Sequence, residues 1–82
     1  NGKQALFNFD KYVLSVVQHS GSYGNERDLF EIGIFKDDVM VEMPGITEPG
    51  DTVKGFLSTA EVNSIIKKIT SVTGVEPKLF KE

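Results

Sequence analysis

A capped amphipathic helix is predicted near the end of the chain, and it limits the folds that the other segments can form. Ser58 stands at an N-cap position, and Glu61, three residues later, completes a capping box. Gly74 can take the left-handed conformation that ends a helix, and Pro77 prevents continuation. The pattern predicts a helix over 59–73. Its apolar stripe follows the helical spacing and comprises Val62, Ile65, Ile66, Ile69 and Val72.

The middle of the chain alternates as strands do. Phe30, Ile32 and Ile34 share one face, and the residues between them share the other. Gly33 and Gly55 fall inside strand patterns, which indicates a bulge or a close backbone approach. The predicted elements are a strand over 29–35, a tight turn over 36–38, a strand over 39–43, a loop over 44–51, and a strand over 52–57 that leads into the helix.

The segment 12–18 is compatible with two structures. Its tyrosine and three valines favour a strand, followed by a polar loop over 19–28. Its apolar spacing also fits a helix within 8–20 that is capped by Asp10. The strand reading predicts an α+β fold in a single domain, 1–82. This fold is an antiparallel three- to four-stranded meander with one C-terminal amphipathic helix packed on one face; the helical reading gives the order α-β-β-β-α.

That alternative order resembles, in the order of elements alone, the double-stranded-RNA-binding domain. The resemblance implies a final helix with a basic N-terminus that grips phosphates. Here the helix opens with Glu61 in place of a lysine cluster, and only Lys67 and Lys68 follow. This departure weakens the case for RNA binding. Binding of nucleic acid or a small ligand through the 19–28 loop and the lysines is kept as the alternative function.

The predicted sheet has apolar residues on both faces, and one helix can cover only one of them. Phe35, Met40 and Phe56 would lie on the face away from the helix, with Val13 and Val17 beside them. Such a face can be buried either by a partner chain or by the tails of this chain. The apolar residues of the tails are Ala5, Leu6, Phe7, Phe9, Leu79 and Phe80.

Reactive side chains are few. The chain has no cysteine, and His19 is its one histidine, so neither a zinc set nor a nucleophile–base pair is predicted. Glu31 and Glu42 could face each other across the predicted hairpin, as acid–base carboxylates do. Nothing in the sequence indicates a cleft around them, so we expect no enzymatic activity, no cofactor and no metal.

Composition sets the remaining expectations. The absence of cysteine favours a reducing, cytoplasmic compartment, with secretion after removal of a signal left open. No run of residues is long and apolar enough to span a membrane. The net charge of −3 argues against nucleic acid and anionic lipid as partners.

These observations predict a non-catalytic interaction or accessory module, such as an assembly subunit or an inhibitor of another protein. Its partner would be another protein chain, including a second copy in a homodimer. Phe35, Met40 and Phe56 would be the buried anchors, and Asp37 and Asp38 would steer a basic partner. Tyr23, in the 19–28 loop, is a further contact candidate.

Overall fold

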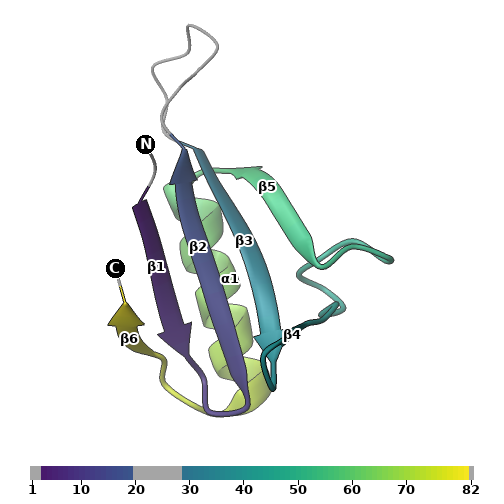
Figure 1. The fold of residues 1–82 in the computed structure, drawn as a ribbon, viewed down its shortest axis with the longest axis vertical. Coiled ribbons are helices and arrows are strands. Elements are labelled where there is room, and N and C mark those ends of the chain that lie inside the picture. The colour runs from purple at the N-terminus through teal and green to yellow at the C-terminus, as the bar shows by residue number, and fades with distance from the viewer. Residues whose placement is uncertain (1–2, 20–28, 82) are drawn as a thin grey trace, which may run out of the picture.

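The computed structural model describes residues 3–19 and 29–81, which form one antiparallel sheet with one helix on it (Figure 1). The predicted α+β fold is confirmed. Strands β4, β3, β2, β1 and β6 follow one another across the sheet, and β5 also pairs with β3. The elements are β1 (Lys3–Asn8), β2 (Tyr12–His19), β3 (Leu29–Lys36), β4 (Val39–Met40), β5 (Val53–Leu57), α1 (Thr59–Thr73) and β6 (Lys78–Lys81).

The first long segment is a strand, so the alternative order α-β-β-β-α is wrong. β2 pairs along its whole length with β3, from Tyr12 opposite Lys36 to His19 opposite Leu29. A β-branched run loses side-chain freedom in a helix and packs well on a pleated sheet, which explains the outcome.

The tails widen the sheet instead of covering it. Residues 3–8 form β1 beside β2, and residues 78–81 form β6 beside β1, so the sheet has more strands than the three or four predicted. Phe9, which was assigned to a tail, lies fully buried in the core on the helix side. The proposal that the tails seal the second sheet face is therefore wrong for the described residues.

The core lies between the sheet and α1. Leu14, Val16, Ile32 and Ile34 from β2 and β3 pack with Ile69 and its neighbours on the helix. The apolar stripe of α1 is buried at Val62, Ile65 and Ile69, but Val72 is 72% exposed. α1 meets β3 and β5, and its last turn leads the chain away toward β6 at the opposite edge, so the buried stripe ends one turn earlier than predicted.

Both ends of α1 are built as predicted. The Ser58 hydroxyl accepts a hydrogen bond from the Glu61 N–H at 3.2 Å, and the Ser58 N–H donates to the Glu61 carboxylate at 2.8 Å. At the other end, Gly74 has φ of 70° and its N–H donates to the Thr70 carbonyl. These contacts satisfy backbone groups that a helix leaves unpaired at its ends.

The capping box predicts a pH-dependent contribution to stability. The pKa of Glu61 is lowered, first by the backbone N–H of Ser58, then by its hydroxyl and by the nearby Lys54 ammonium. Because the folded pKa lies below the unfolded value of about 4.3, this stabilisation is present above that value and is lost as pH falls through the folded pKa. We expect the difference in free energy of unfolding between the wild type and Glu61→Gln to shrink below about pH 4.

Urea denaturation of both proteins, followed by circular dichroism from neutral to acidic pH, measures this difference. Glutamine keeps an acceptor at the same position without its charge, so it isolates the titration of Glu61 from the loss of the hydrogen bond. A difference that stays constant over the whole pH range would show that the ionised carboxylate contributes nothing.

The segment after β3 departs from the predicted strand over 39–43. A two-residue turn at Asp37 and Asp38, both with positive φ, joins Lys36 to its pairing partner Val39, as in a type I′ hairpin. β4 then ends at Met40, and the chain turns inward so that Met43 and Ile46 enter the core. The Thr47 hydroxyl accepts from the Met43 N–H at 3.0 Å, which satisfies a polar group in this buried loop.

Both strand glycines mark irregular places, as predicted. Pairing between β3 and β5 shifts between Phe30 and Ile32, so the stretch with Gly55 and Phe56 forms a bulge. Phe56 has φ of 58° there, and its side chain is 82% exposed. Gly33 is buried, and a Cβ built on it would lie only 3.0 Å from the terminal methyl of Met40. The glycine thus allows a close approach.

Candidate functional site

The sheet face opposite α1 is the main candidate for a functional surface. Leu14 and Ile34 point toward the helix, and alternate residues of a strand point to opposite sides, so their neighbours in β2 and β3 point away from it. In Figure 1, no described element crosses in front of β1, β2 and β3 on that side. We call this surface the open face. Its apolar members are Leu6, Val13, Val17, Phe35, Met40 and Val53.

The open face is continuous because its members are paired across the strands. One row runs from Val13 through Phe35 to Met40. The next row runs from Leu6 through Ser15 and Gly33 to Val53. An apolar sheet surface of this kind, left uncovered, is typical of an interaction site.

The centre of the open face is made of small residues. Ser15 and Gly33 are buried and lie opposite each other. The Ser15 hydroxyl accepts from the side-chain amide of Gln4 at 3.0 Å, and the Met40 methyl lies over Gly33. Met40 remains 39% exposed and Val53 40% exposed, so apolar atoms rather than polar ones meet the solvent here.

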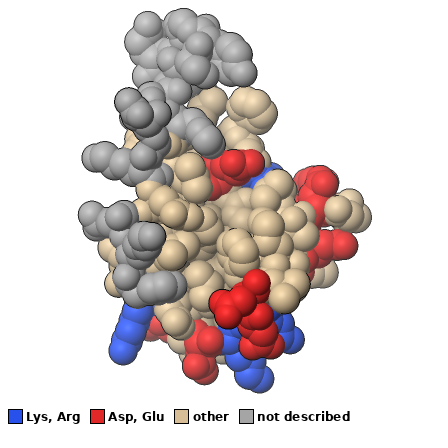
Figure 2. All heavy atoms as spheres, in the orientation of Figure 1, with Lys and Arg blue, Asp and Glu red and all other residues tan. Residues whose placement is uncertain are grey.

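Carboxylates border the open face on the side of β4 and the loop that follows it. Figure 2 views this face, and it shows uncharged atoms over most of the centre and red Asp and Glu groups along the right and lower margins. A further red group, with blue atoms beside it, lies in the upper part of the face. The described segment 29–51 carries six acidic residues against one lysine. Five of them, Asp37, Asp38, Glu42, Glu48 and Asp51, belong to the turn before β4 and the loop after it. Glu31 lies on the open face itself, opposite Val17, and Lys36 is the one lysine.

Lys36 does not neutralise this margin on the open face. Its ammonium lies 5.7 Å from the centre of the Tyr12 ring, a cation–π contact, and Tyr12 packs against the core on the helix side. The turn residues Asp37 and Asp38 are exposed beside it. The sheet margin at this turn therefore presents negative charge.

The structure brings only some of the predicted site residues together. Phe35 and Met40 are direct cross-strand partners, and Asp37 and Asp38 form the turn that joins their strands. Phe56 lies apart from them on the bulge of β5. Tyr23 falls outside the described residues. Alternation in the sequence located Phe35, but it did not identify Leu6 or Val53 as members of the open face, because their places depend on long-range pairing.

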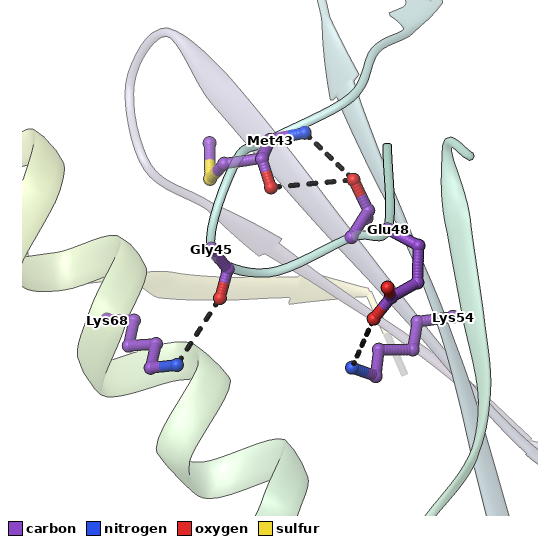
Figure 3. A network of polar contacts seen from close by, with 6 residues as sticks. Met43, Gly45, Glu48, Lys54 and Lys68 are labelled. Atoms are coloured by element: carbon purple, nitrogen blue, oxygen red, sulfur yellow. Dashed lines mark hydrogen bonds and ion pairs between the residues drawn. The ribbon is translucent and has the colours of Figure 1, made fainter. Parts of the chain in front are cut away.

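The second candidate is a cleft of about 280 Å³ between α1, β5 and the loop after β4. Lys54, Lys68 and Glu61 line it, but each already has a partner. Lys68 donates to the Gly45 carbonyl at 3.3 Å, and Lys54 lies 3.5 Å from the Glu48 carboxylate (Figure 3). Glu61 belongs to the helix cap. The charged side chains of the cleft thus hold the loop and the helix cap in place.

The described residues contain no assembled catalytic or metal-binding group. Glu31 and Glu42 do not face each other, because β4 ends before Glu42, whose carboxylate instead accepts from the Gly50 N–H at 3.0 Å. Within 3–19 and 29–81, no cluster of three acidic or histidine side chains could hold a metal ion. In the same ranges, every buried side-chain nitrogen or oxygen has a hydrogen-bond partner.

Comparison with known proteins adds no assignment. No family model, no curated protein sequence and no solved structure matches this chain significantly. Within the part of the chain that the structure describes, no helix has both the length and the apolar character needed to cross a bilayer.

Proposed function

We propose that the chain is a non-catalytic interaction module that binds another protein through its open face. The observation that carries this proposal is a paired, continuous apolar surface on the side of the sheet that α1 leaves uncovered. Protein surfaces of this kind are buried against partners, because removal of apolar area from water stabilises the complex.

Two features of the open face suit a protein contact. Met40 has an unbranched, flexible side chain that adapts to the shape of a partner, and it already lies over the small residue Gly33. Phe35 beside it offers an aromatic surface, a type that recurs at the energetic centre of interfaces. The lysines of the competing cleft are by contrast already engaged in contacts within the chain.

The proposal can be tested by site-specific photo-crosslinking in cells that naturally produce the chain. A photoreactive amino acid at position 53 lies on the open face, whereas one at position 72 lies on the exposed outer part of α1. We expect position 53 to give a discrete crosslinked protein and position 72 to give none.

A paired substitution makes this test specific. Met40→Gln with Val53→Thr keeps side-chain size but makes two half-exposed positions polar, so stability should change by less than about 1 kcal/mol. For this variant the photoreactive residue is placed at position 17, also on the open face. We expect its crosslink to be at least about tenfold weaker than in the chain without the two substitutions. Equal crosslinking from positions 53 and 72, or from neither, would exclude the open face as the contact surface.

A further inference from the structure

We propose that the occupant of the open face is a basic protein surface, in which an apolar patch is bordered by lysine or arginine. This inference rests on the proposed function and specifies the chemistry of the partner. It follows from the negative charges around the open face and from the short or bulged strands at the sheet edges.

The charge pattern favours a cationic partner. Asp37 and Asp38 are exposed at the turn beside Met40, and the loop after β4 adds Glu42 and Asp51, also exposed. Lys36 is drawn to the Tyr12 ring on the helix side. A partner that placed its cations along this margin would meet opposite charge, which speeds encounter and sets orientation.

Other occupants fit this pattern less well. Nucleic acid and anionic lipid carry phosphates, which the acidic margin repels. A second copy carries the same net charge of −3 and the same acidic segment, so the approach of two copies is opposed at long range. A partner of opposite charge has neither disadvantage.

The sheet edges are poor places for a partner strand. β4 has two residues and β6 has four, so each offers a short row of backbone groups. β5 is interrupted by the bulge at Gly55 and Phe56. Short and bulged edges discourage strand addition, so the sheet face is the surface that a partner would use.

The test uses two synthetic hairpin peptides with the same apolar face, one with lysine and one with glutamate at its border positions. Each is titrated into the isotopically labelled chain, and backbone amide signals are followed by NMR. We expect the lysine peptide to shift signals of β2, β3 and β5 and to bind at least about tenfold more tightly than the glutamate peptide at low salt. Its affinity should fall as salt is added.

A charge variant locates the effect. Asp37→Asn with Asp38→Asn removes two charges without changing the turn, because asparagine tolerates positive φ as aspartate does. This variant should bind the lysine peptide about three- to tenfold more weakly. Glu76→Gln, which removes one charge from the segment between α1 and β6, should change the affinity by less than about twofold.

The possible results separate the two proposals. If position 53 still crosslinks a protein but neither peptide binds, or both bind equally, the basic-partner inference is wrong and the interaction surface stands. If the chain sediments as a dimer and the paired Met40→Gln, Val53→Thr variant is monomeric, a second copy occupies the open face and the inference is overturned. If position 53 gives no crosslinked protein, the open face is excluded as the interaction surface and both proposals are wrong.

Discussion

Replacement of Phe9 by alanine is expected to lower the free energy of unfolding by about 3–5 kcal/mol. Phe9 lies in the turn between β1 and β2, where its side chain is fully buried against the core. Its N–H donates to the Tyr12 carbonyl at 2.7 Å, so the backbone holds the ring inward. A chain of 82 residues has a total stability of roughly 4–12 kcal/mol, so this substitution removes a large share of it.

Phe56→Ala provides a matched control, because the same change is made at a side chain that is 82% exposed. Its positive φ is equally unfavourable for phenylalanine and alanine, so backbone strain does not differ between the two proteins. We expect a change of less than about 0.5 kcal/mol. Urea denaturation of both variants gives the comparison. Similar losses for Phe9→Ala and Phe56→Ala would contradict the observed difference in burial.

Ile46→Ala is expected to cost about 2–5 kcal/mol, although Ile46 lies in a loop. Its side chain is 5% exposed and belongs to the same core cluster as Ile65 and Ile69. The loop backbone is fixed by the hydrogen bonds from Ile46 and Thr47 N–H to the Met43 carbonyl, at 3.0 and 2.9 Å. The site therefore has little freedom to collapse around the cavity that alanine leaves.

The control for Ile46 is Val72→Ala on α1. Val72 belongs to the predicted apolar stripe but is 72% exposed, and alanine has the higher helix propensity. Val72→Ala should leave the free energy of unfolding unchanged or raise it by a few tenths of a kcal/mol. A loss above about 2 kcal/mol for Val72→Ala, with little effect of Ile46→Ala, would mean that the loop lies outside the core.

The parts of the fold that sequence reasoning predicted correctly are those with local signals. The bounds of α1 follow from Ser58, Glu61 and Gly74, which act within a few residues of the helix ends. The alternation of Phe30, Ile32 and Ile34 located the buried face of β3 in the same way. Both depend on signals that lie within a single element: capping residues in the helix and alternation in the strand.

The parts that were missed depend on contacts between distant segments. β6 is a strand because Leu79 pairs with Phe7 of β1. The residues next to Leu79 in the sequence do not indicate that pairing. The prediction placed Ile46 in a loop, because turn residues surround it, and did not include it in the core, where its side chain is buried.

The candidate site shows the same division. Phe35 and Met40 are neighbours in one hairpin, so a local turn brings them together. Gly55 did indicate a bulge, but the sequence could not show that Phe56 would consequently turn into solvent. Leu6 in β1 and Val53 in β5 complete the open face on either side of β2 and β3, and their positions follow only from the complete pairing order.

The pairing of β1 with β6 has a practical consequence. Leu6 lies opposite Lys81, so the first and last strands, β1 and β6, run side by side along one margin of the sheet (Figure 1). An affinity tag, a fluorophore or a neighbouring domain joined at either end would leave the molecule from that margin. The chain could thus be anchored to a sensor chip by either terminus without obstructing Phe35 and Met40.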